Sequence, residues 1–325
     1  MSDIVLDSGA YSIMSGAVSG KNLTMEKYAE YVKEHGDKYT SRFNFDAIMD
    51  GKKSYENWVW LRKQGLDILP VFHPGTPERY LIKYMKQTDY ISLGAIANIH
   101  RGELMKVLNI IWEDHLLDSN GKPKCKVHGL GITSYNVMKS FPWYTVDSTS
   151  ANIRAAYGTM LLPQRLHKDV TEDMSHPWQF VSLSNRKGKR TEVATLGSNQ
   201  SLYWMWSKDL QKRFRDYIES MGFDLGEFKP GTFEFGKPEE YTPLDLKVNK
   251  SLTDSPYTRT LWNAQFMQRW IDQNGTPKIY HVIGTHLAEL MYDMPLLVSF
   301  AKGTSTLNKV WEKIEDGRQK AKQAD

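Results

Sequence analysis

Over its first 150 residues the chain alternates short strand-like runs with helical segments. The strand-like runs are rich in β-branched or aromatic residues and are bounded by turn-forming residues. They comprise residues 4–7, 42–48, 68–73, 90–96, 126–132 and 144–148. An alternation of this length implies a parallel sheet with right-handed crossover connections.

The segments between these runs carry helix start signals. Three helices are expected to begin at Thr24, Ser54 and Thr76, because a side-chain hydroxyl can accept the free N–H groups of a first helical turn. A fourth helix is expected over residues 103–117, where apolar residues recur at helical spacing.

Six strand–helix units before residue 150 favour an α/β fold of the (β/α)8 TIM type. A doubly wound sheet is the structural alternative. Residues 278–284 are interpreted as a late barrel strand, with a helix expected over residues 286–300. The predicted organisation is a first barrel part at 1–158, an insertion with a β-hairpin and a helix at 159–250, and a barrel-closing part at 251–325.

Composition excludes several classes of protein. The chain has 325 residues, of which 40% are hydrophobic, and no apolar run approaches the ~20 residues that span a bilayer. The start shows no secretion leader. We therefore expect no membrane partner and a cytoplasmic location, in the host cytoplasm if a phage encodes the chain. Cys125 is the only cysteine, so neither an internal disulfide nor a thiolate zinc cluster can form.

Polar residues stand where the expected strands end. Asp7 and Asp147 each close a strand-like run and precede small residues. The carboxyl ends of parallel strands are where α/β enzymes keep their catalytic groups, so two carboxylates at one mouth predict a nucleophile and an acid/base for glycosyl chemistry. Other strand ends carry Asp46, His73, Gly94 with Ala95, and His128 with Gly129.

A second feature is a cluster of four cations around one glycine. Arg186, Lys187, Lys189 and Arg190 form a predicted hairpin turn, and Trp204 follows among further basic residues. Cations suit a phosphate backbone and aromatic faces can stack bases, which predicts a nucleic-acid contact. The alternative is a solvated turn beside a core-facing aromatic strand.

Histidines leave another chemistry open. His73, His128 and His281 fall on predicted strands, so a metal-dependent barrel hydrolase is a competing hypothesis. The paired histidines on one early strand that such barrels commonly use are missing, and no metal site is assigned. The glycines near residue 130 lack the third glycine of a dinucleotide fingerprint.

Five short motifs together resemble one family. Asp-Ser-Gly-Ala-Tyr, Phe-Asp, Leu-Gly-Ala, His-Gly-Leu-Gly and Val-Asp-Ser occur at residues 7–11, 45–46, 93–95, 128–131 and 146–148. Their order resembles that in tRNA-guanine transglycosylases. Two further segments, at residues 70–75 and 141–150, look like the phage-type relatives that place 7-deazaguanine bases in DNA.

The resemblance implies a role for each matching residue. Asp147 would attack C1′ of the target guanosine and form a covalent sugar intermediate, and Asp7 would handle the proton of the departing and incoming base. The implied base-binding residues are Asp46, Ser8, His73, Gly94, Ala95, His128 and Gly129.

The resemblance also implies the reactants. The expected partner is DNA, with tRNA as the alternative, and the co-substrate is a free 7-deazaguanine base of the preQ0 type. No other cofactor is expected, and no structural zinc, because the three cysteines that hold it in the tRNA enzymes are missing. A non-catalytic nucleic-acid-binding barrel, in which both aspartates only cap turns, is the remaining hypothesis.

Overall fold

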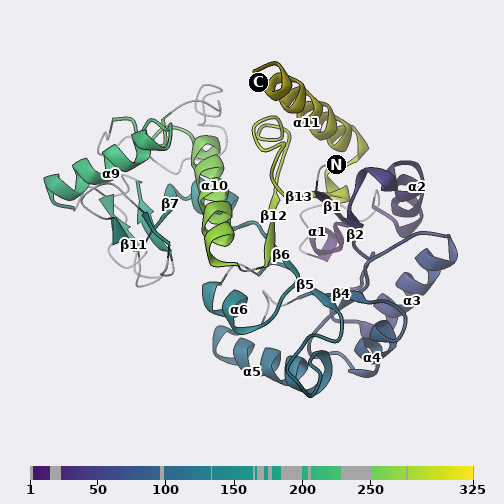
Figure 1. Cartoon of the computed structure of the whole chain (residues 1–325). Coiled ribbons are helices and arrows are strands. Elements are labelled where there is room, and N and C mark those ends of the chain that lie inside the picture. Colours follow the sequence, from purple (N-terminus) through teal and green to yellow (C-terminus); the bar gives the residue numbers. More distant parts are fainter. Residues whose placement is uncertain are drawn as a thin grey trace. The chain divides into compact units, whose positions relative to one another are not determined.

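The computed structural model describes residues 3–14, 23–95, 99–132, 134–163, 165–166, 172–174, 178–183, 200–203, 206–227, 251–275 and 277–324. The chain forms two compact units (Figure 1). The first unit combines Met1–Ser148 with Thr276–Asp325, and the second unit is Thr149–Gly275. The second unit covers more residues than the predicted insertion at 159–250.

The first unit is built on a curled parallel sheet of eight strands in the order β2-β1-β13-β12-β6-β5-β4-β3. The strands are β1 (Ile4–Asp7), β2 (Ser41–Arg42), β3 (Val71–Phe72), β4 (Tyr90–Leu93), β5 (Lys126–Gly129), β6 (Thr145–Ser148), β12 (Lys278–Val282) and β13 (Leu296–Ser299). All neighbouring pairs are parallel. This α/β architecture is compatible with a TIM-type fold.

Helices connect these strands (Figure 1). They are α1 (Ala10–Met14), α2 (Met25–His35), α3 (Gly51–Lys63), α4 (Arg79–Met85), α5 (Arg101–Ile111), α6 (Tyr135–Ser140) and the final helix α11 (Thr304–Ala324). A π-helical turn, Trp112–Leu116, extends α5, so the helix predicted over 103–117 is largely confirmed.

Backbone bonds also join the segments beside the two edge strands, β2 and β3. Phe43 and Leu69 form a parallel bridge. The Leu69 N–H donates to the Arg42 carbonyl at 2.8 Å, and the Asn44 N–H donates to the Leu69 carbonyl at 2.9 Å. The chain after β2 therefore pairs with the chain before β3.

An apolar layer lies inside the curled sheet. Its buried members are Val5, Phe43, Leu69, Val71, Tyr280 and Leu297. Side chains alternate between the two faces of a strand, so Asp3, Val5 and Asp7 share the inner face. The apolar layer consequently separates a polar layer at the amino ends of the strands from another at their carboxyl ends.

The three predicted helix starts differ in outcome. The start predicted at Thr76 is wrong, because α4 begins at Arg79 and the Thr76 hydroxyl donates to the His73 carbonyl at 2.8 Å. Thr24 caps α2 as predicted, since its hydroxyl accepts the Lys27 N–H. The predicted start at Ser54 is wrong: α3 begins at Gly51 and is capped by Asp50, whose carboxylate accepts the Lys53 N–H at 2.9 Å. Ser54 is buried inside α3, where its hydroxyl bonds the Ala47 backbone instead.

The helix predicted over residues 286–300 is also wrong, because β13 occupies Leu296–Ser299. Its apolar residues are buried on both faces between β1 and β12. A short continuous apolar run of this kind looks the same in a buried strand and in a buried helix. β13 is the strand that brings the sheet to eight.

The second unit has a small sheet of its own. It contains α7 (Ser150–Ala156), β7 (Thr159–Leu162), β8 (Arg165–Leu166), β9 (Glu172–Asp173), β10 (Gln179–Ser182), β11 (Gln200–Leu202), α9 (Lys208–Ser220) and α10 (Pro256–Asn274). β10 pairs antiparallel with β7 and parallel with β11. The Asn263 side chain of α10 joins these elements: it accepts the Leu161 N–H at 2.8 Å and donates to the Ala151 carbonyl at 3.2 Å.

The helix predicted within the insertion at 159–250 is confirmed as α9, which Ser207 caps. The predicted basic turn, with Arg186, Lys187, Lys189 and Arg190, lies outside the described residues, as does Trp204. Within the part of the chain that the structure describes, no helix is long and apolar enough to cross a membrane.

Candidate active site

Three carboxylates gather at the carboxyl ends of the strands of the first unit. Asp7 ends β1, Asp147 lies near the end of β6, and Asp46 follows β2. The charges of Asp46 and Asp147 both raise the pKa of Asp7, so the three groups act on one another electrostatically. The structure thus brings together the three aspartates that the sequence pattern singled out.

Asp7 has an unusual protonation equilibrium. Burial, as the largest cause, raises its pKa to about 6, with the carboxylates of Asp46 and Asp147 adding to the shift. The Ser299 hydroxyl and the Gly9 N–H act against this increase of the pKa. Since an effective acid/base catalyst has a pKa near the working pH, Asp7 can take up and release a proton near neutrality.

The structure explains why a glycine follows Asp7 and Ser8 in the Asp-Ser-Gly motif. Gly9 has a φ of +83°, and a Cβ there would lie 2.5 Å from the Cβ of Ala301. Only glycine accommodates both the left-handed backbone and the close approach. Gly9 therefore lets the chain turn directly after Asp7 and present its N–H to that carboxyl group.

Asp147 is held by two donors. Its Oδ1 accepts the Gly131 N–H at 2.7 Å, and its Oδ2 lies 3.3 Å from Nε2 of His128. His128 is fully buried, and its Nδ1 lies 2.6 Å from the Thr145 hydroxyl. These contacts fix the position of the carboxylate, which keeps only a small exposed fraction of 6%.

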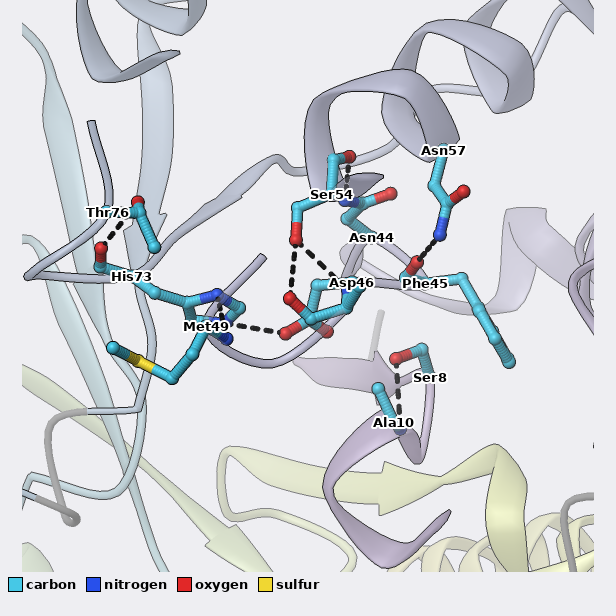
Figure 2. A network of polar contacts seen from close by, with 11 residues as sticks. Ser8, Ala10, Asn44, Phe45, Asp46, Met49, Ser54, Asn57, His73 and Thr76 are labelled. Atoms are coloured by element: carbon cyan, nitrogen blue, oxygen red, sulfur yellow. Dashed lines mark hydrogen bonds and ion pairs between the residues drawn. The ribbon is translucent and has the colours of Figure 1, made fainter. Parts of the chain in front are cut away.

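Asp46 is paired with His73. Nε2 of His73 lies 2.7 Å from Oδ2 of Asp46, and Nδ1 accepts the Met49 N–H at 3.2 Å. Figure 2 shows the imidazole ring between the two partners. Because the Met49 N–H occupies Nδ1, the proton of the neutral ring is on Nε2 and is donated to Asp46. Both ring nitrogens are engaged, so His73 positions Asp46, and its predicted contact with a base stays a prediction.

The segment that carries Asp46 is anchored to α3. The Asn44 amide donates to the Ser54 carbonyl at 2.9 Å, and the Asn57 amide donates to the Phe45 carbonyl at 2.7 Å (Figure 2). The buried Ser54 hydroxyl adds its two bonds to Ala47. Polar side chains of one helix thus satisfy the irregular backbone around Asp46 and hold it in place.

Gly94 and Ala95 follow β4 beside this pair. A Cβ on Gly94 would lie 2.6 Å from Cγ1 of Val71 and 3.0 Å from Cδ2 of His73, so glycine makes room for the His73 ring. Ala95 has a φ of +57° and Met49 a φ of +62°. Left-handed non-glycine residues cost of order 1–3 kcal/mol and cluster at functional sites.

The remaining predicted residues have other contacts. Ser8 is buried and its hydroxyl accepts the Ala10 N–H at the start of α1. Gly129 serves packing, since a Cβ there would lie 2.4 Å from Ile132 and 3.0 Å from Trp143. His128 contacts Asp147, as described above. Their predicted contact with a base stays a prediction.

Sequence reasoning missed two contributors. Ser299 acts on Asp7 from the end of β13, the strand that was predicted as a helix. Thr145 engages His128 from the first position of β6. A corrected strand assignment at residues 296–299 would have placed Ser299 at the same mouth.

The described part of the chain contains no group of three or more His, Cys, Asp or Glu side chains arranged to hold a metal ion. Comparison with known proteins found no matching family model, no matching curated protein and no matching solved structure.

Proposed function

We propose that the chain is a base-exchange transglycosylase that replaces guanine in DNA with a 7-deazaguanine derivative of the preQ0 type. One observation carries the proposal. The Asp7 carboxyl group has a pKa of about 6 and interacts electrostatically with the Asp147 carboxylate, which Gly131 and His128 hold in position. Two carboxyl groups in different environments are the arrangement that glycosyl transfer through a covalent intermediate requires.

The proposed reaction has two displacements. An Asp147 carboxylate oxygen attacks C1′, the C1′–N9 bond breaks, and the departing guanine takes the proton of Asp7. The incoming base then returns a proton to the Asp7 carboxylate, and its nitrogen displaces Asp147 from C1′. The net change is one base exchanged for another, with the sugar configuration retained and Asp7 and Asp147 restored.

Recognition of the base follows from Asp46. The bond with His73 engages Oδ2 of Asp46 and leaves Oδ1 for a ligand. Guanine and 7-deazaguanine both present N–H donors along one edge, and a carboxylate oxygen accepts such donors. The half-exposed Met49 side chain, at 53% exposure, stands beside this pair as an apolar surface for the ring.

We infer that the eight strands close as a (β/α)8 barrel, and the Phe43–Leu69 bridge with its two flanking hydrogen bonds supports closure. DNA as the polymer rests on the resemblance of the motifs, and tRNA is the alternative. Contact through the basic segment at 186–190 and a cytoplasmic location remain part of the proposal.

Nucleoside mass spectrometry tests the function directly. The protein is incubated with a 7-deazaguanine base and either duplex DNA or tRNA, and digested nucleosides are measured. We expect deazaguanosine in DNA with the wild type, none with Asp147→Asn, and wild-type levels with Asp293→Asn, which removes an exposed carboxylate. Incorporation only in tRNA would mean that tRNA is the polymer substrate. Base exchange by Asp147→Asn at the wild-type rate would refute the assignment of Asp147 as the nucleophile.

A further inference from the structure

A cavity lies at the opposite end of the sheet from the three carboxylates. It has a volume of about 690 Å³ and is lined by Trp311 of α11 and by the first residues of five strands, Ser41, Tyr90, Lys126, Thr145 and Lys278. The amino-terminal end of a barrel ordinarily serves stability alone. A volume of this size instead falls in the range of ligand sites, which is about 300–1,000 Å³.

Aromatic side chains form the walls of this cavity. Tyr90 and Tyr144 pack edge to face with ring centroids 5.5 Å apart, and Tyr144 is 50% exposed. On the wall formed with α11, Trp311 packs against Tyr39 with a centroid distance of 5.6 Å and donates its indole N–H to the Tyr39 hydroxyl at 3.1 Å. Hydrogen-bonded and mutually packed rings are held in place, so they offer preformed faces for a flat ring.

The cavity is also electropositive. Four cations, Lys38, Lys126, Lys278 and Arg318, line it against two carboxylates, Asp3 and Asp37. Lys278 is paired with Asp3 and Arg318 with Glu315. The Lys126 amine lies 4.9 Å above the centroid of the Tyr144 ring, a cation–π contact that leaves its charge without a carboxylate partner among the described residues. An anion bound there would meet this ammonium group next to an aromatic face.

A chain of hydrogen bonds leads from the cavity towards Asp147. The Tyr90 hydroxyl lies 2.7 Å from the Thr145 hydroxyl, which lies 2.6 Å from Nδ1 of His128. Both Tyr90 and Thr145 line the cavity, and His128 contacts Asp147. The cavity is thereby connected through the interior of the sheet to the carboxylate at the other end.

We propose that this cavity is a second ligand site, which takes a nucleoside phosphate. The aromatic walls would stack the base, and Lys126 would pair with the phosphate group. This site goes beyond base exchange and does not require it, since Asp7, Asp46 and Asp147 do not line the cavity.

Isothermal titration calorimetry of the full chain with AMP, adenosine and inorganic phosphate tests the site. AMP is chosen because its base lacks the donor edge of guanine that Asp46 is proposed to accept. We expect AMP to bind more tightly than adenosine or phosphate alone. Lys126→Gln is expected to raise the Kd for AMP about tenfold, since loss of one charge-assisted bond is worth roughly that factor, and Tyr144→Ala is expected to weaken AMP as well.

Two variants serve as controls. Lys106→Gln removes an equal charge from the exposed face of α5, and Asp147→Asn alters the other end of the sheet. Both are expected to bind AMP like the wild type. The proposal is overturned if AMP shows no binding at millimolar concentration, or if both lysine variants behave alike. It is also overturned if Asp147→Asn abolishes binding, or if adenosine or phosphate alone binds as tightly as AMP.

Discussion

Replacing Asp7 with asparagine should stabilise the protein at neutral pH. Burial and the neighbouring carboxylates raise the pKa of Asp7 from 3.8 to about 6. The folded protein therefore holds the Asp7 proton up to a higher pH than the unfolded chain, and ionisation above pH 6 is a cost that the folded state alone bears. Asparagine has the same shape, can accept the Gly9 N–H, and does not ionise.

The magnitude follows from the size of the shift. A difference of about 2.2 pKa units between 3.8 and 6 corresponds to about 3 kcal/mol at 1.36 kcal/mol per unit. Above pH 6 the free energy of unfolding of the wild type is lower by this full amount. The reduction shrinks as the pH falls from 6 towards 3.8 and disappears at still lower pH. The stability difference between Asp7→Asn and the wild type should accordingly be about 2.4 kcal/mol larger at pH 8 than at pH 4, where the wild type still bears a small part of the cost.

Urea unfolding at a series of pH values measures this difference. The comparison across pH removes any effect of the amide that does not itself depend on pH. Asp293→Asn is the matched control, because its carboxylate is exposed, and its stability difference should stay nearly constant with pH. A stability difference for Asp7→Asn that changes by less than about 0.5 kcal/mol between pH 4 and 8 would refute the argument that Asp7 is ionised at a cost. The proposed role of Asp7 as acid/base would then lose its physical basis.

Other variants test neighbouring features. Burial lowers the pKa of His281 from 6.5 to about 4, and neither ring nitrogen has a hydrogen-bond partner among the described residues. His281→Leu should therefore unfold at higher urea than the wild type. It should also abolish the loss of up to about 3 kcal/mol of stability that the wild type suffers as the pH falls from 6.5 to 4. An unchanged pH dependence would contradict this. Gly94→Ala should cost about 1–3 kcal/mol, because its Cβ would overlap Val71 and displace His73, whereas Gly284→Ala, with open space around it, should cost little in the same urea assay.

The sequence pattern was informative wherever structure depends on neighbouring residues. The cap at Thr24, the helix after Ser207 and seven of the eight strands of the first unit lie within or close to the predicted segments, because caps and strand periodicity are local properties. The cap at Ser54 was misjudged because its hydroxyl bonds Ala47, a contact that only the folded loop creates.

Sequence by itself predicted a parallel α/β sheet with aspartates at the strand ends, since turn residues and polar groups follow each buried run in the chain. Only the tertiary structure decided what those aspartates experience. The pairing of β1 with β13 brings Ser299 to Asp7, and the bridge between residues 43 and 69 brings Asp46 to His73. The pKa of a buried group depends on desolvation, and its hydrogen-bond partners are atoms distant in the chain. Neither can be predicted from the spacing of residues along the sequence.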